Sequence, residues 1–423
     1  MSAGAFSREI PPLRGFSLGL VYLCLSFPLG SWVGRIPQIK ESLGASDASW
    51  GLASTIATCG EVIGLAIIVV LVGRASTRRM TIVTAGVVLA MGPMVALSPA
   101  LPALVTSLTL WMIASKILGT TSGALILVYQ RDLGRIVFGR FDALYSIGML
   151  IGGALSWAAI RQDIPASHQF AITNSMLAIA LLISFRALPD EATPTTQAQP
   201  ILRRLRNRFT APLLLLGGLS LLASFIDSAA AQWAGIFLSR TAGGDPALGS
   251  LGYVLVMVSK SACLLVIGTV SARFGWRAIV LISVAATTLA LLLGVGSGLL
   301  VPGMIALLVL GAGTAFFGPM VNTLASAQPG VTDGEARTML EMGELPAYIA
   351  TPVLVGVLAS ALDVRWAFLI MTGLPLLACA ALFLAPGTRR LLPSHEYSYN
   401  QDPNRRRHAP EPDDDADAPS CRG

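Results

Sequence analysis

Charged side chains inside long apolar runs are the residues of this sequence that could do chemistry. Glu61, Lys116, Asp227 and Lys260 each lie well inside such a run. A charge at the centre of a bilayer costs at least about 2.5–3.5 kcal/mol, so it usually pairs with another charge or faces a wet cavity. A carboxylate there can carry a proton, and an ammonium group can pair with it or hold an anion. We therefore predict that these four residues line a proton or substrate pathway.

Glu61 and Lys260 occupy matching places in the two halves of the chain. Glu61 lies 12 residues before Gly73, and Lys260 lies 8 residues before Gly268, a difference of about one helical turn. Two interpretations are open for this pair. The two groups meet across a boundary between the halves in one state and part in another, or each is satisfied within its own half.

Lys116 and Asp227 also leave alternatives open. Gly119 and Gly123 follow Lys116 at helical spacing, which would let a helix or a ligand approach closely. Lys116 could hold an anionic substrate, or it could neutralise Glu61 or Asp227. Asp227 is a candidate proton carrier, and the alternative is a structural hydrogen bond to a neighbouring helix.

Further candidates lie near residues that interrupt a helix. Proline removes a backbone donor, and interrupted spans often mark the binding site of a membrane protein. One candidate follows Pro28 in the first span, one follows Pro319 in the tenth span, and two follow Asp227 in the seventh span. The predicted cavity residues are Trp32, Gln232, Trp233 and Asn322. Ordinary helix packing is the alternative for each of them.

Two glutamates near the start of a later apolar run could act as a gate. Glu341 and Glu344 are three residues apart and share one helix face. They could be charges favoured by a helix N-terminus. Alternatively, they could meet Arg78 and Arg79 and close one side of the molecule.

The elements that must position these residues are membrane-spanning helices. The chain of 423 residues is 54% hydrophobic and only 12% charged, whereas soluble domains carry about 25% charged residues. Runs of about 20 apolar residues recur, each enough to span a bilayer. The twelve predicted spans are Phe16–Gly34, Trp50–Val72, Met80–Ser98, Ala103–Val128, Phe138–Ile160, Gln169–Phe185, Pro212–Leu238, Gly249–Ser271, Ala278–Val295, Leu300–Leu324, Thr338–Leu362 and Trp366–Ala385.

Basic residues predict the orientation and the domain boundaries. The termini and even-numbered gaps between spans hold 22 Lys and Arg, and the odd-numbered gaps hold five. By the positive-inside rule, both termini are cytoplasmic. The polar, Pro-rich stretch Pro189–Arg208 reads as a linker. The predicted division is an N-terminal segment, a six-helix bundle, a linker, a second six-helix bundle and a disordered tail, at residues 1–15, 16–187, 188–210, 211–385 and 386–423.

The loops after the second and eighth spans carry a repeated pattern. The first holds Gly73 with Arg78 and Arg79, and the second holds Gly268, Arg273, Gly275 and Arg277. Twelve spans with a basic central linker and these loops resemble the major facilitator superfamily of secondary transporters. The resemblance implies a latch on the inward side, although Ala272 stands where the family places an acid.

A second resemblance points to one branch of the superfamily. The segments Gly30–Asp47, Arg140–Leu155 and Ile226–Leu238 look like a bacterial branch near the sugar-permease-like members. Asp142 stands where that branch usually shows His, and we count it among the gating residues. The resemblance implies an all-α membrane fold of two pseudo-symmetric six-helix bundles. It also implies that the first, fourth, seventh and tenth helices line a cavity, with the second and eighth at the boundary between bundles.

The predicted function is secondary transport of a small molecule by alternating access, coupled to protons, in a bacterial inner or plasma membrane. We expect a monomer in the lipid bilayer and no nucleic-acid partner. No metal-binding or phosphate-binding motif occurs, so we expect neither a metal nor another cofactor. The alternatives are a substrate-sensing receptor that does not transport and, with less support, a membrane-embedded enzyme.

Overall fold

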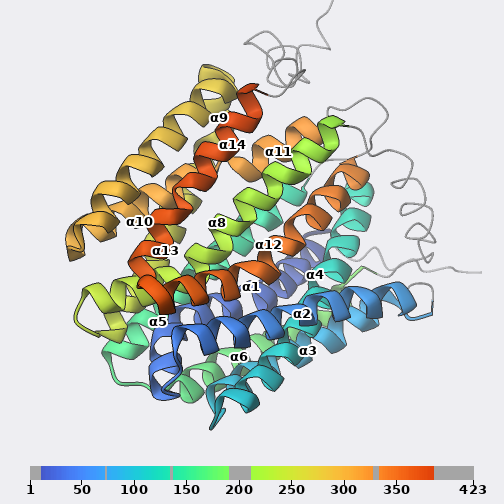
Figure 1. Cartoon of the computed structure of the whole chain (residues 1–423). Helices are drawn as coiled ribbons and strands as arrows, with labels where there is room; N and C mark the ends of the chain where they lie inside the picture. Colours follow the sequence, from blue (N-terminus) through green and yellow to red (C-terminus); the bar gives the residue numbers. More distant parts are fainter. Residues whose placement is uncertain (1–10, 72–73, 134–136, 190–210, 327–332, 385–423) are drawn as a thin grey trace, which may run out of the picture.

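The protein is built from helices that are long and apolar enough to cross a membrane. A computed structural model describes residues 11–71, 74–133, 137–189, 211–326 and 333–384 (Figure 1). No strand occurs in these ranges, and eleven of their helices could span a bilayer by length and composition, with a shorter apolar stretch at Val364–Leu377. The helices are α1 Pro11–Ser42, α2 Asp47–Leu71, α3 Thr77–Ala96, α4 Leu101–Leu133, α5 Phe138–Arg161, α6 Ala166–Ser184, η1 Phe185–Ala187, α8 Ala211–Thr241, α9 Pro246–Ala290, η2 Leu291–Val295, α10 Leu300–Thr314, α11 Phe317–Ser326, α12 Asp333–Leu362, α13 Val364–Met371 and α14 Gly373–Leu384.

The helices correspond to the twelve predicted spans with changes at their ends. The eighth and ninth spans are joined in α9, where Gly275 (φ 72°, ψ 156°) turns the chain, a conformation open to glycine. The tenth span comprises α10 and α11, and the twelfth comprises α13 and α14. The first span was predicted to end at Gly34, but α1 continues to Ser42. The eleventh was predicted to begin at Thr338, but α12 begins at Asp333.

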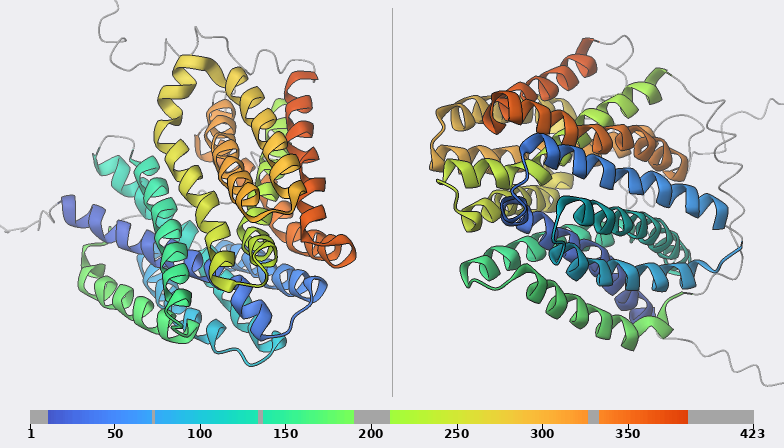
Figure 2. Two further views of the ribbon diagram at one scale, coloured as in Figure 1. Left: turned by 90° about the vertical axis from the view of Figure 1, so that its left-hand side faces the viewer. Right: turned by 60° about the horizontal axis from the view of Figure 1, so that its bottom comes forward.

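The helices form two groups that meet along a few crossings. Helices α1–α6 pack on one another and so do α8–α14, and the groups join where α2 packs on α12, α5 on α9, and α1 on α8 and α9. Helices α5 and α9 lie close together at one end and diverge toward the other (Figure 2). The second and eighth spans therefore both lie at the boundary, as the resemblance implies, but each packs on a different partner.

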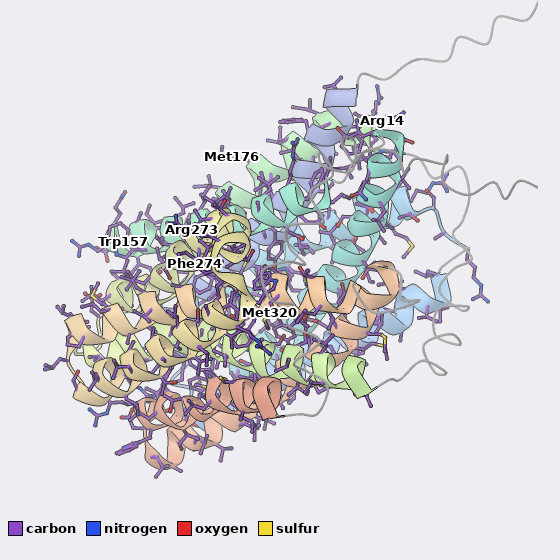
Figure 3. All side chains as sticks on the ribbon, turned by 90° about the horizontal axis from the view of Figure 1, so that it is seen from above. Arg14, Trp157, Met176, Arg273, Phe274 and Met320 are labelled. Atoms are coloured by element: carbon purple, nitrogen blue, oxygen red, sulfur yellow. The ribbon has the colours of Figure 1, made fainter. Side chains whose placement is uncertain are left out.

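Apolar side chains cover the outside as well as the core. Trp157 and Met176 are 37% and 66% exposed on the outer side of the first group, whereas Met320 is fully buried (Figure 3). Many exposed residues of the long helices are Leu, Ile and Val. Such a surface suits lipid rather than water, so burial of the polar groups described below is the informative feature.

Candidate functional site

The two helix groups are joined by an ion pair at one end of the molecule. Asp47, the first residue of α2, accepts a hydrogen bond from Arg240 Nη2 of α8 at 2.6 Å. Lys40 Nζ at the end of α1 lies 2.9 Å from the same carboxylate oxygen, and the Asp47 side chain is only 6% exposed. We call the end that carries these residues the contact end. Two charged donors on one buried carboxylate make a strong and directional contact.

One turn further along α2, the backbones of the two groups touch. A Cβ built on Gly51 would overlap the carbonyl oxygen of Pro352 in α12 and would lie 3.0 Å from the Cα of Gly356. Gly356 faces the carbonyl of Asp47 in the same way. Any side chain at either glycine would push α2 and α12 apart.

A second turn along α2, a hydroxyl enters the hydrogen-bond ladder of α12. Thr55 Oγ1 donates to the carbonyl of Ile349 at 2.9 Å and accepts from the Val353 amide at 3.1 Å. Ile349 and Val353 are the two residues that one helical hydrogen bond would join, and Pro352 lies between them. Asp47, Gly51 and Thr55 are spaced by four residues and form one stripe of α2, which we call the contact stripe.

Near mid-helix, Asp227 of α8 and Lys260 of α9 form an ion pair. Lys260 Nζ donates to Asp227 Oδ2 at 2.6 Å. The Lys260 side chain is 21% exposed and the Asp227 side chain is 32% exposed. The pair lies within one helix group. In this structure the Lys260 ammonium group is therefore paired within its own half of the chain and not with Glu61. This agrees with the second of the two interpretations of Lys260.

Glu61 and Lys116 bring two further charges to the same region from the other group. Lys116 of α4 packs against α2 next to Gly64, where an added Cβ would lie 3.0 Å from the Lys116 Cβ. The Glu61 and Lys116 side chains are close enough to interact electrostatically, which we call electrostatic reach, and Glu61 is also within electrostatic reach of Glu341. Within the described residues, neither Glu61 nor Lys116 has an ion pair within 4.0 Å.

Helix α12 supplies a third carboxylate and a tyrosine. Ser220 Oγ of α8 donates to Glu344 Oε1 at 2.8 Å, and Glu344 lies within electrostatic reach of Asp227 and Lys116. One turn on, Tyr348 lies within reach of Glu344, Asp227 and Glu61. We call the set Glu61, Lys116, Asp227, Lys260, Glu344 and Tyr348 the central cluster.

For Glu344, the structure does not show the predicted contact with the loop arginines. Glu344 bonds to α8 instead of facing the loop arginines. Arg78 Nη2 donates to the carbonyls of Phe185 and Arg186 at 3.1 and 3.0 Å, so it binds the free carbonyls where α6 and η1 end. The reason is the earlier start of α12, which places Glu344 about three turns inside the helix.

Most of the other predicted gating residues are exposed. Arg79, Arg277 and Gly268 are exposed, and the exposed Arg273 lies 5.5 Å from the ring centre of Phe274 (Figure 3). Gly275 makes the turn within α9, and Asp142 is exposed near the start of α5. Gly73 lies outside the described residues.

Two of the predicted cavity residues pack in the interior. Trp32 is 4% exposed and stacks on Trp50 with ring centres 6.0 Å apart, and Trp233 is fully buried. For both tryptophans the structure favours helix packing, the alternative interpretation. Gln232 is partly buried and donates to Ser228 Oγ at 3.4 Å. Asn322 is exposed, and its side chain donates to the carbonyl of Gly318 in its own helix.

Sequence reasoning missed a buried arginine. Arg35 directly follows the predicted end of the first span at Gly34, but it lies within α1 and is fully buried. Its Nε donates to Gln169 Oε1 at 2.8 Å, its Nη2 donates to the Ile164 carbonyl at 2.8 Å, and its Nη1 donates to Gln38. These acceptors let the charge remain inside the helix, so α1 does not end at Gly34. The only signal in the sequence is an arginine followed by further apolar residues.

Comparison with known proteins identifies the fold. No family model matches the chain. An uncharacterized transporter of Sinorhizobium fredii, y4wD, is 25% identical over 385 residues, covering 90% of this chain and 98% of the relative. An uncharacterized MFS-type transporter of Yersinia pestis is 20% identical over 250 residues, covering 58% and 62% of the two chains.

Solved structures agree with these relatives. A mutant of the nucleoside transporter NupG matches with a TM-score of 0.71 and 15% identity, over 90% of this chain and all of that one. A D-xylose–proton symporter matches with a TM-score of 0.70 and 14% identity, over 89% of this chain and 98% of that one. The chain therefore has the fold of the major facilitator superfamily. These two relatives and two structural neighbours are transporters, a class without enzymatic activity.

Proposed function

We propose, from the major facilitator fold and the relatives named as transporters, that this chain is a secondary transporter that moves a small molecule by alternating access with proton coupling. The observation that carries the proposal is the central cluster. It gathers charges from both helix groups near the middle of their helices, where a charge is costly unless it is used or paired. A site between two halves near the midplane is the usual arrangement in such proteins.

The Asp227–Lys260 ion pair supports the coupling step. A proton bound by the Asp227 carboxyl group would neutralise it and remove its attraction for the Lys260 ammonium. The ammonium would then be free to pair with a carboxylate of the other group. The predicted meeting of Lys260 with Glu61 in a second state is the simplest such exchange.

The contact stripe supports alternating access. The basic-residue bias predicts cytoplasmic termini, which would place the contact end on the outer side of the membrane. The halves would then be held together outside in this structure, and the stripe would part when the site opens outward. We propose that residues 16–187 and 211–385 move as two units, that the protein acts as a monomer in a bacterial inner membrane, and that no cofactor is needed.

Flux measurements in proteoliposomes test the proposal. Purified full-length protein is reconstituted with an enclosed pH-sensitive dye, and sugars, nucleosides, amino acids and amines are added outside in turn. We expect one class to move protons together with substrate. We expect Asp227→Asn to abolish the proton movement and the uphill transport, while downhill exchange of substrate remains.

A matched control uses an ion pair far from the cluster. Arg14 and Asp132 pair at 3.1 Å near the surface, with side chains 31% and 50% exposed, so Asp132→Asn should leave coupling unchanged. Uphill transport by Asp227→Asn at the normal rate would refute proton transfer at this residue. Saturable binding with no flux of any compound would favour the substrate-sensing receptor.

A further inference from the structure

When all its groups are ionised, the charges of the central cluster do not balance. It holds three carboxylates, Glu61, Asp227 and Glu344, and two ammonium groups, Lys116 and Lys260. Uncompensated charge in a protein interior is costly. The cluster therefore favours the arrival of a positive charge.

The two ammonium groups are already shared among the carboxylates. Lys260 is bound to Asp227 at 2.6 Å. Lys116 lies within reach of both Glu61 and Glu344, but it has no ion pair within 4.0 Å among the described residues. An anionic ligand would increase the excess of negative charge. A neutral ligand would leave it as it is, and a cation would reduce it.

Tyr253 provides an independent observation beside the cluster. Its ring packs against Gly153 of the other helix group, where an added Cβ would lie 3.1 Å from the ring. The residue is 2% exposed, yet its hydroxyl forms no hydrogen bond to any described residue. It lies within electrostatic reach of Asp227 and Tyr145. Burial of a hydroxyl group without a hydrogen bond is unfavourable, so a ligand that bonds to the Tyr253 hydroxyl would bind more tightly.

Two further tyrosine hydroxyls lie near the carboxylates. Tyr348 lies within electrostatic reach of Glu61, Asp227 and Glu344, and Tyr145 lies within reach of Glu61. Tyrosine hydroxyls beside carboxylates can bond to the N–H or O–H groups of an organic cation, which a bare metal ion lacks.

We propose that the central cluster binds a small organic cation with N–H or O–H groups, held by Asp227 and Glu344 and bonded to the Tyr253 hydroxyl. This names the substrate class of the site and rests on the proposed transport function, but binding can be measured without transport. Lys116 and Lys260 keep the site from becoming so negative that the cation cannot leave.

Binding to matched pairs of compounds tests the charge requirement. The probes are glucosamine against glucose, and choline against 3,3-dimethyl-1-butanol, which has the shape of choline without its charge. Affinity for full-length protein in lipid nanodiscs is measured by calorimetry at constant pH and salt. We expect the cation of at least one pair to bind at least 10-fold more tightly than its neutral partner.

Two variants assign the selectivity to the cluster. Glu344→Gln should weaken cation binding at least 10-fold and leave neutral binding unchanged. The control Glu41→Gln changes an exposed carboxylate of α1 outside the cluster and should have no effect. Tyr253→Phe keeps the ring against Gly153 and should weaken binding of the amine several-fold without lowering thermal stability.

The outcomes separate this inference from the proposed function. Equal binding of the cation and its neutral partner in both pairs, or no cation bound in either pair, overturns the cation inference. Proton-linked flux of a neutral compound would then still leave the protein a transporter. Selective cation binding that Glu344→Gln does not weaken would also overturn the assignment to this cluster.

Discussion

Helix α2 passes through two regions that differ in how their polar groups are satisfied. In the contact stripe, Asp47 has two cationic partners and the Thr55 hydroxyl has both a donor and an acceptor. Less than two turns further on, Glu61 has charges within reach but no ion pair among the described residues. The polar groups of the contact stripe therefore have partners within the protein, whereas Glu61 in the central cluster has no direct ion-pair partner among the described residues.

The difference indicates separate roles along one helix. Satisfied polar groups and close backbones hold one arrangement of the two helix groups. Charged groups at mid-membrane that lack a direct ion-pair partner can bind a proton or a ligand. Because one rigid helix carries both, movement at Glu61 and separation at Asp47 are expected to be coupled. Changes within the contact stripe should therefore alter the closing of the halves more than the selectivity of the central cluster.

The largest effect is expected from Gly51→Leu. The new side chain would overlap the Pro352 carbonyl and press on Gly356, so α2 and α12 could not close at the contact end. We expect loss of transport, and we expect cysteines placed on either side of the contact end to become accessible to a membrane-impermeant reagent. Gly86→Leu is the control, because an added Cβ there meets nothing within 4 Å. Normal transport by Gly51→Leu would show that this crossing does not need to close.

A smaller effect is expected from Asp47→Asn. The change keeps the shape but weakens the bonds from Arg240 and Lys40, which at a buried charged acceptor are worth about 1.5–3 kcal/mol each. The 40% exposure of Arg240 lowers its share. We expect a lower thermal midpoint and a larger accessible fraction at the contact end. Arg240→Gln should act in the same direction, and the double variant should lose less than the sum of the two. Full additivity would mean that the pair is not coupled.

The sequence allowed prediction of the spans and of most charges in the central cluster, because a charge inside an apolar run is visible without a structure. The Asp47–Arg240 pair could not be predicted. Its members are 193 residues apart, and their meeting depends on how α2, α8 and α12 cross. Glu344 was predicted to lie near the end of a helix. Because α12 begins at Asp333, about one turn earlier than predicted, Glu344 lies further inside the helix.

The smallest effect is expected from Thr55→Val. Valine keeps the shape of threonine but removes the hydroxyl that donates to Ile349 and accepts from Val353, so each of these backbone groups loses one bond. A lost hydrogen bond of this type costs about 1 kcal/mol. Thr58→Val is the matched control, because among the described residues the Thr58 hydroxyl bonds only to the Ser54 carbonyl in its own helix, at 2.8 Å. We expect Thr55→Val alone to shift the contact end toward the accessible state, with unchanged ligand selectivity. Equal accessibility in the two variants would mean that the hydroxyl bridge does not hold the halves together. A change in selectivity would mean that the contact stripe and the central cluster are one site.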